Sequence, residues 1–277
     1  MKLFTALFIL TLLSPVGANL DEIRERAQEY RAYDELVANI TEISYKGDIY
    51  YWVDFERVFQ YSGSVLLDEN KDPVRDKNVI LAFAKARVIH REYNGKMVSE
   101  WFALASSYGE ISRAISELRN SFKDNSVRNK IGILANDSRA LSKLSSESAF
   151  YLNRSLSIFS PDDAEMYMEK QEGMMEKLGY MQKECNDAID AINTSGNEHK
   201  VDAIKIINDY GGSLKRTSDI IKSNRDLIDE STGKMTENIY ERVISKKIEP
   251  YITQNLALWV AVFIIIFALY FLTRRLM

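Results

Sequence analysis

Side chains that could catalyse a reaction or bind a metal are few in this chain, and their spacing fits no known motif. The two histidines, His90 and His199, each lack a second histidine or cysteine at the spacing of a zinc site. The sequence contains no nucleophile elbow, zinc-protease helix, phosphate-binding loop, dinucleotide-binding glycines or EF-hand loop. We therefore predict a noncatalytic protein that uses no cofactor and no metal.

Acidic residues occur in adjacent pairs, at Asp34-Glu35, Asp162-Asp163 and Asp229-Glu230. Neighbouring positions on a helix diverge by about 100°, so these pairs are not expected to form acid–base dyads. A further acidic stretch, residues 68–72, could contact calcium loosely. It lacks the glycine and the distal bidentate glutamate of a calcium-binding loop, and we predict a turn there instead.

The chain has one cysteine, Cys185, which excludes an internal disulfide. It could form an intermolecular bridge or carry a lipid, but its register on a predicted helix favours a place in the core. Four Asn-X-Ser/Thr sequons permit glycosylation of an exported surface, at Asn39, Asn136, Asn153 and Asn193.

The N-terminus has the composition of a secretory signal peptide. Lys2 precedes an apolar run over residues 3–13, and small residues precede a cleavage site after Ala18. Eleven apolar residues are too short to span a bilayer comfortably, which argues against the alternative of an uncleaved N-terminal anchor. We predict a signal peptide over residues 1–18 and export of the chain that follows.

The C-terminal segment 251–273 carries no charge. As a helix it would be about 35 Å long, which is enough to cross a hydrocarbon core of about 30 Å. We predict a single transmembrane helix with a cytoplasmic tail over residues 274–277, since basic residues at the end of a span favour the cytoplasmic side. The predicted membrane-anchor residues are Leu256, Trp259, Phe263, Ile266, Tyr270, Arg274 and Arg275. A tail-anchored protein facing the cytosol is the alternative, and the predicted signal peptide argues against it.

The segment between these two ends, residues 19–254, is mildly acidic. It contains all 40 acidic residues and 33 of the 36 basic ones, for a net charge of −7. This balance argues against nucleic acid as a partner and against broad adhesion to anionic lipid.

Three successive segments repeat apolar residues at alternating spacings of four and three, which is the pattern of helices packed at a shallow angle. The first begins at Met97, the second at Val127 and the third at Tyr167. The first seam comprises Met97, Trp101, Leu104, Tyr108, Ile111, Ile115, Leu118 and Phe122. The second comprises Val127, Ile131, Leu134, Ser138, Leu141, Ser145, Ser148, Leu152, Ser155 and Phe159. The third comprises Tyr167, Gln171, Met174, Leu178, Met181, Cys185, Ala188 and Ile192.

A fourth helical stretch, residues 198–248, is expected to kink or break at its glycines, Gly211-Gly212 and Gly233, before it passes into the membrane helix as a stalk. Short links between the four segments favour antiparallel neighbours. Residues 95–250 are therefore predicted to form an up-and-down helical bundle with this stalk.

Polar and sulfur-containing positions on the seams allow two interpretations. The serines of the second seam either permit close packing, returning their hydroxyls to the carbonyl four residues back, or face a ligand or a membrane partner. The methionines of the third segment, which include Met174 and Met181, either fill the core or form an adaptable binding face. Packing is the favoured interpretation of both.

Residues 19–94 differ from the rest and are predicted to form a helix, a β-hairpin and a second helix. An amphipathic helix is expected over residues 19–44. The period then changes to two over residues 49–55, which favours a strand, and residues 63–67 favour its partner. Asp76 is expected to cap the second helix, which ends near Tyr93.

The hairpin segment GDIYYWVDFE…GSVLLDENKDPV resembles the PepSY-type small exported module, in which a YxVxF strand is followed by a second strand and an acidic turn. The threonine-glycine usual in that turn is replaced here by Lys71-Asp72. The resemblance implies a noncatalytic binding or inhibitory module. Aromatic residues around the hairpin form either a binding surface or the core of the module: Tyr50, Tyr51, Trp52, Phe55, Phe59 and Tyr61.

Together these patterns predict a mainly α protein: an antiparallel up-and-down bundle, a small N-terminal α/β hairpin module and one C-terminal transmembrane helix. The predicted function is display of the bundle outside the membrane for contact with a protein partner or for homo-oligomeric assembly. The alternative is an extracytoplasmic sensor of a small ligand that signals through a partner membrane protein, with the serines and methionines lining the pocket.

Overall fold

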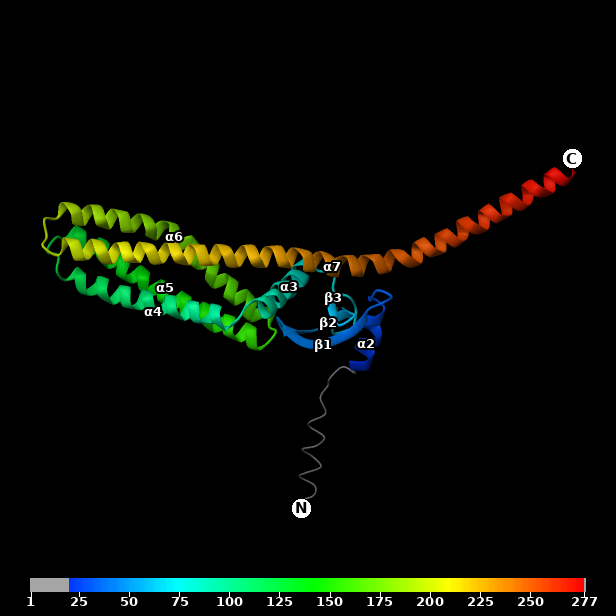
Figure 1. Cartoon of the computed structure of the whole chain (residues 1–277), viewed down its shortest axis with the longest axis horizontal. Helices are drawn as coiled ribbons and strands as arrows, with labels where there is room; N and C mark the ends of the chain where they lie inside the picture. The colour runs from blue at the N-terminus through cyan, green and yellow to red at the C-terminus, as the bar shows by residue number, and fades with distance from the viewer. Residues whose placement is uncertain (1–19, 277) are drawn as a thin grey trace, which may run out of the picture. The chain divides into compact units, whose positions relative to one another are not determined.

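The computed structural model describes the backbone of residues 20–276 and the side chains of residues 20–244. The predicted signal peptide, residues 1–18, lies outside the described residues, and so do the side chains of the predicted membrane segment 251–273. Among the residues with described side chains, no helix is long and apolar enough to cross a bilayer. The described chain is mainly helical and contains one three-stranded antiparallel sheet (Figure 1).

The described chain divides into two compact units. Unit 1 comprises residues 20–43, 48–75 and 237–276, and it contains most of the sheet. Unit 2 comprises residues 44–47 and 76–236, and it contains the helical bundle. The sequence analysis places a domain boundary near residue 94. The structure instead groups residues 76–94 with the bundle, because the helix in this segment packs against bundle helices.

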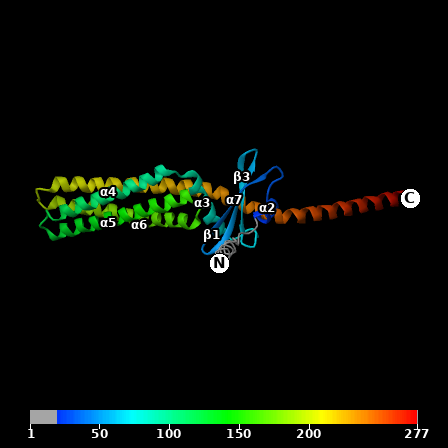
Figure 2. The same cartoon turned by 90° about the horizontal axis from the view of Figure 1, so that it is seen from below.

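Unit 2 is a bundle of long helices that run up and down beside one another, as the two views in Figures 1 and 2 show. Its helices are α4 (Gly95–Arg119), α5 (Asn125–Ser157), α6 (Pro161–Thr194) and the first part of α7 (Lys200–Leu276). The capping signals act as expected, since Ser160 accepts a hydrogen bond from the backbone N–H of Asp163 and Pro161 occupies the first helical position. A bundle is thus confirmed.

The predicted seams form the core of this bundle. All ten residues of the second seam and all eight of the third are buried. On α4 the seam is buried except at Met97 and Ile111, which are half-buried. Heptad spacing identifies these positions well because each helix contacts its neighbours along one continuous stripe.

Helix α7 departs from the prediction in two ways. It is helical without interruption from Lys200 to Leu276, so the expected breaks at Gly211-Gly212 and Gly233 are wrong. Glycine costs about 1 kcal/mol in a helix interior, which tertiary packing readily offsets. The seam also includes polar residues that an apolar count misses, because Thr217, Asn224 and Thr232 are buried.

Of the seam serines, Ser138 bonds to the neighbouring helix rather than to its own, and Ser142 and Ser112, which lie outside the seams, do the same. Ser138 on α5 donates its hydroxyl to the carbonyl of Tyr108 on α4 at 2.7 Å, and Ser142 donates to Ala105 at 2.7 Å. In return, Ser112 on α4 donates to the carbonyl of Ala135 on α5 at 2.8 Å. These hydroxyls therefore join two helices and are consistent with close approach of their backbones.

A shorter helix, α3 (Lys77–Glu92), precedes the bundle helices and packs against α5 and α6. Asp76 caps it by accepting a hydrogen bond from the backbone N–H of Asn78 at 2.8 Å, as predicted. Its buried face includes Ile80, Phe83 and Ile89.

Unit 1 contains α2 (Leu20–Gln28), β2 (Asp48–Arg57), β3 (Gln60–Asp68) and all but the last two residues of β1 (Leu36–Tyr45). The strand order in the sheet is β1-β2-β3. The predicted helix over residues 19–44 is wrong beyond Gln28, because the apolar residues that follow belong to a strand. β-branched residues are frequent in this stretch, which favours a strand over a helix. The two strands predicted as a hairpin are present and are longer than expected.

The core of unit 1 lies between one face of the sheet, α2 and α7. Tyr51, Val53 and Phe55 alternate along β2, and each is buried. The remaining members of this cluster are Ile23, Ala27, Tyr30, Val65, Leu67 and Val243. Val243 belongs to α7, so a residue far along the chain completes this core.

Candidate functional site

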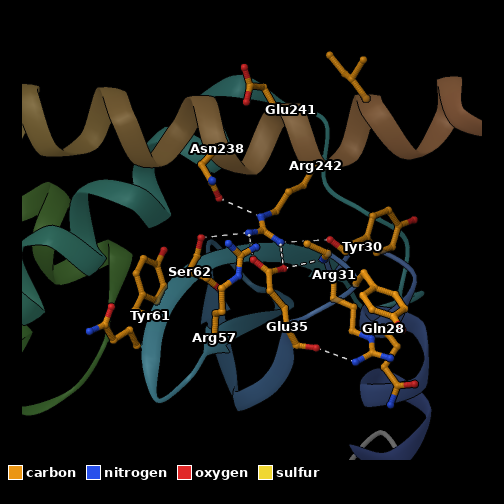
Figure 3. Close-up of a pocket in the computed structure, with 14 residues that line it drawn as sticks. Gln28, Tyr30, Arg31, Glu35, Arg57, Tyr61, Ser62, Asn238, Glu241 and Arg242 are labelled. Atoms are coloured by element: carbon orange, nitrogen blue, oxygen red, sulfur yellow. Dashed lines mark hydrogen bonds and ion pairs between the residues drawn. The ribbon is translucent and has the colours of Figure 1, made fainter.

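An open groove of about 1340 Å³ in unit 1 is the candidate site. The loop after α2 lines it on one side, the β2–β3 hairpin lines it on the other, and α7 lines it between them. Figure 3 shows Arg242 extending from α7 toward Glu35, with Arg57 and Tyr61 to one side and Arg31 to the other.

The floor of the groove is a buried ion pair between Glu35 and Arg242. The two guanidinium Nη atoms meet the two carboxylate oxygens at 2.6 and 2.8 Å, which is the bidentate geometry of a strong pair. The side chain of Glu35 is 2% exposed and that of Arg242 is 13% exposed. Glu35 also accepts a hydrogen bond from the backbone N–H of Ala32 at 2.7 Å. The carboxylate is therefore well satisfied despite its burial.

Arg242 makes further contacts that fix its position. Its guanidinium donates to the carbonyls of Tyr30 at 3.3 Å and Ser62 at 3.1 Å, and to Oδ1 of Asn238 at 3.0 Å. It also lies over the ring of Phe55, with 5.0 Å from Cζ to the centroid. Arg242 thereby connects α7 to both loops of the groove and to the sheet.

A local irregularity in the sheet makes room for these contacts. Phe55 pairs with Gly63 and Glu56 pairs with Tyr61, so the ladder skips Ser62, as in a β-bulge. A Cβ atom on Gly63 would lie 2.4 Å from Nη2 of Arg242. A side chain at residue 63 would require Arg242 and Asn238 to shift, so the glycine permits this close approach.

The pairing changes the acidity of Glu35. Hydrogen bonds from Arg242 lower the pKa of the Glu35 carboxyl from 4.5 to about 2, against the opposing effect of burial. Glu35 is thus ionised at neutral pH, which suits a structural anion better than a proton donor or acceptor.

The rim of the groove differs from its floor. Tyr33, which lines the groove, is 100% exposed; in the turn between the lining residues Arg57 and Gln60, Val58 is 84% exposed and Phe59 93%. Arg57 and Asp34 form an ion pair at 2.7 Å that connects the two rims. The groove thus combines a floor whose charges are paired with exposed apolar and aromatic side chains at its edge.

The acidic pairs of the sequence are separated by their partners. Asp34 and Glu35 bind different arginines, Arg57 and Arg242. In the second pair, Asp163 lies 3.2 Å from Arg154 and Asp162 is exposed. In the third pair, Asp229 lies 3.7 Å from Arg225, and Glu230 accepts a hydrogen bond from Lys234 at 2.8 Å. Each of the other five carboxylates has its own cationic partner.

The two histidines lie apart from the groove. His90, on α3, has Nδ1 2.9 Å from the carbonyl oxygen of Ser155 and lies beside the ring of Phe159. His199 is exposed at the start of α7, with Nε2 3.7 Å from the neighbouring Glu198. Both positions are those of structural or solvated side chains.

The remaining sequence candidates have clear positions. Cys185 is buried at 1% exposure on its seam, and burial raises the pKa of its thiol to about 12. The four sequon asparagines, Asn39, Asn136, Asn153 and Asn193, are exposed. In two of these sequons the serine is buried in the bundle, at Ser138 and Ser155.

The hairpin aromatics divide between core and surface. Tyr51, Trp52 and Phe55 are buried, whereas Phe59 and Tyr61 are exposed. Trp52 donates its indole N–H to the buried carboxylate of Asp54 at 2.6 Å, which also accepts from Ser64 at 2.7 Å. The buried aromatic residues of the cluster therefore belong to the core of the module, whereas Phe59 and Tyr61 belong to its surface.

In the acidic turn over residues 68–72, carboxylate side chains bind backbone N–H groups and a neighbouring arginine. Oδ1 of Asp68 accepts from the N–H groups of Asn70 and Asp72 at 2.9 Å each, and the side chains of Arg26 and Asp72 pair at 3.1 Å. Across the side chains described by the structure, no group of three or more His, Cys, Asp or Glu residues could hold a metal ion.

Sequence reasoning missed Arg242, Gly63 and the role of Glu35. Arg242 is a charged residue within a helical pattern, and nothing local distinguishes it from the solvated charges around it. The one available signal is Gly63 at the start of a predicted strand, since glycine there often marks a bulge or a close backbone approach.

Comparisons of the chain with protein-family models, with curated proteins and with solved structures return no match. The resemblance of the hairpin to a PepSY-type module therefore stays a prediction.

Proposed function

We propose that this chain is an exported, single-pass, noncatalytic membrane protein that presents its bundle and its sheet unit for contact with other proteins or for assembly. The observation that carries the proposal is the course of α7. This one helix supplies a seam of the bundle up to Thr236, supplies Arg242 to the groove, and continues through the uncharged segment 251–273.

The surface of the bundle supports a role in protein contact. Large aromatic side chains are exposed on three of its helices: Phe102 is 52% exposed, Phe150 52% and Tyr180 57%. Aromatic residues are enriched in protein interfaces because they bury a large area with few rotatable bonds. Buried seams and exposed aromatics together favour a scaffold that docks through its outer faces.

Impermeant labelling of single cysteines in intact cells tests the anchor and its orientation. Cys185 is buried, so Asn70→Cys and Arg275→Cys add one reactive thiol each on opposite sides of the predicted span. The proposal predicts that an impermeant maleimide labels Asn70→Cys before permeabilisation and Arg275→Cys only after it, and that carbonate does not extract the chain. Equal labelling of both sites in intact cells, or release by carbonate, would contradict it.

A second candidate function is favoured by the place of the groove. Asn238, Glu241 and Arg242 line it from the same helix that leads to the predicted span, so a small ligand bound there would contact that helix directly. The groove replaces the seam serines and methionines as the expected ligand site, because the seam serines, Met174 and Met181 are all buried inside the bundle. A thermal-shift screen on the full chain tests this sensor function, with Arg57→Ala as the groove variant that should abolish any stabilisation by a ligand.

A further inference from the structure

The groove of unit 1 has more cations than anions in its lining. Arg31, Arg57 and Arg242 line it. The lining carboxylates are those of Glu35 and Glu241. Both oxygens of Glu35 are occupied by the two Nη atoms of Arg242, so these two charges cancel. Glu241 points away from Arg242 across α7 (Figure 3). Arg31 and Arg57 are thus cations that no carboxylate of the lining neutralises.

Both of these arginines have N–H groups available to a ligand. Arg31 donates through Nη1 to the backbone carbonyl of Glu35 at 2.7 Å. Arg57 pairs through Nε with Oδ2 of Asp34 at 2.7 Å. Among the residues that the structure describes, neither guanidinium has another polar partner, so both Nη atoms of Arg57 are open. An open guanidinium edge is suited to binding a carboxylate through two hydrogen bonds.

The pairing with Asp34 does not withdraw Arg57 from the groove. The side chain of Arg57 is 50% exposed and that of Asp34 is 54% exposed. A pair this exposed is screened by solvent and held weakly. Because Asp34 contacts only Nε, a carboxylate that enters the groove can bind the Nη edge of the same guanidinium.

The size and shape of the groove indicate what kind of anion it suits. Its volume of about 1340 Å³ exceeds the roughly 300–1,000 Å³ of ordinary small-molecule pockets, and it is open along its length. Arg57 and Arg31 lie on opposite sides of Arg242 (Figure 3), which suits a ligand with several successive carboxylates. Tyr33, fully exposed in the lining, adds aromatic surface of the kind that is enriched in protein interfaces.

We propose that the groove of unit 1 binds an extended acidic segment of a partner protein, with aspartate or glutamate side chains on Arg57 and Arg31. This inference rests on the proposed role in contact with other proteins and gives that role a surface and a partner chemistry. Recognition of acidic motifs by arginine side chains is a recurring mode of peptide binding. The contact is noncovalent, and salt should weaken it.

Binding of a labelled peptide to the full-length chain in phosphatidylcholine nanodiscs tests the proposal. The probe is a fluorescent hexapeptide of alternating aspartate and glutamate, and its matched control carries asparagine and glutamine with the same label. Fluorescence anisotropy should show saturable binding of the acidic peptide, at least about tenfold tighter than that of the control. Equal binding of the two peptides, or no binding of the acidic one, would overturn the inference.

Substitutions at two exposed ion pairs separate the groove from general charge attraction. Arg57→Gln should weaken binding of the acidic peptide at least about fivefold. The matched control is Arg225→Gln, because Arg225 is also an exposed arginine that pairs through Nε with an aspartate, Asp229, but it lies in the bundle. An equal loss in both variants would mean attraction to positive charge in general and would contradict the proposal.

Removal of the competing carboxylate should have the opposite effect. Asp34→Asn keeps the cation and frees its Nε, so the acidic peptide should bind at least about twofold tighter. Asp229→Asn makes the same change in net charge outside the groove and should leave the affinity unchanged. Weaker binding in Asp34→Asn would show that the ion pair only stabilises the rim, and would overturn the assignment of Arg57.

Succinate and photo-crosslinking distinguish this inference from the proposed functions. Displacement of the peptide by succinate at a similar concentration would assign the groove to small dicarboxylates and overturn the inference in favour of the sensor function. In intact cells, a photoreactive phenylalanine analogue in place of Tyr33 reports the groove, and one in place of Phe102 reports the bundle.

The crosslinking outcomes differ for each hypothesis. Protein crosslinks at Tyr33 that Arg57→Gln abolishes are the expected result. Crosslinks at Phe102 alone would overturn the acidic-segment inference and leave protein contact through the bundle intact. Crosslinks at neither position would count against the proposed role in protein contact as a whole.

Discussion

The two units reach stability by different means. Unit 2 repeats the same contact along its helices, so each buried seam residue is one of many and its neighbours in sequence belong to the same stripe. Unit 1 has a small core, and a single cation on α7, Arg242, joins its sheet, its loops and its helix. One mutation in the repeated interface of unit 2 should therefore lower the free energy of unfolding only slightly. Loss of the central ion pair of unit 1 should lower it much more.

Removal of the cation should have the largest effect. Arg242→Ala leaves the carboxylate of Glu35 buried without its partner, and breaking such a pair costs about 3–5 kcal/mol. Pulse proteolysis of the full chain in urea should show cleavage within residues 20–75 at much lower denaturant, with the bundle still resistant. The exposed pair of Lys234 and Glu230 provides the control, since solvent screens it and Lys234→Ala should leave the cleavage pattern unchanged.

Acid should weaken unit 1 selectively. The pKa of Glu35 is about 2 in the folded chain and 4.5 when unperturbed, so its contribution is fully present above pH 4.5 and is lost as pH falls toward 2. The difference corresponds to about 3 kcal/mol. Unfolding of unit 1 between pH 6 and pH 2 measures it. Glu35→Gln should be less stable at pH 6 and should lose this part of the acid dependence; an unchanged dependence would contradict the assignment.

A substitution at Gly63, where Arg242 approaches the backbone closely, should lower stability by a smaller amount. In Gly63→Ala the new methyl group would overlap Nη2 of Arg242, and overpacking of this kind costs about 1–3 kcal/mol. Gly95→Ala is the matched control because a Cβ atom there meets nothing within 4 Å. Thermal unfolding should separate the two variants; equal melting temperatures would mean that Arg242 can move aside without loss.

The bundle should show the smallest effects, and they should depend on hydrogen bonding rather than on residue type. Ser138→Ala removes the donor to Tyr108 and should cost about 1 kcal/mol. Ser148 is equally buried, but its hydroxyl has no partner among the described residues, so Ser148→Ala should be neutral or slightly stabilising. Urea unfolding of the bundle compares them, and a larger loss for Ser148→Ala would reverse the interpretation.

The sequence predicts the bundle more completely than it predicts unit 1, because it encodes local periodicity and not contacts between distant residues. Seams such as that from Val127 to Phe159 recur at fixed spacing, so periodicity alone locates the buried face. The caps at Asp76 and Ser160 follow equally from local hydrogen bonding. The predicted helix over residues 19–44 extends through β1 in error. The apolar residues of β1 follow α2 and can be fitted to the helical period as well as to the strand period.

The groove could not be predicted because its parts are far apart in the chain. Glu35 and Arg242 are separated by 207 positions, and each taken alone resembles a solvated surface charge. Gly63 carries a weak local signal for a bulge and none for an approaching guanidinium. Contacts of this kind depend on tertiary structure, which local pattern and propensity do not encode.

Hydrogen exchange of the full-length chain in nanodiscs, comparing wild type with Arg242→Ala, tests most directly whether unit 1 depends on one cation while the bundle does not. The account predicts that amides of β2 and β3 lose most of their protection in the variant, while amides of α5 and α6 exchange at wild-type rates. Unchanged protection in the strands, or an equal loss in the bundle helices, would contradict it.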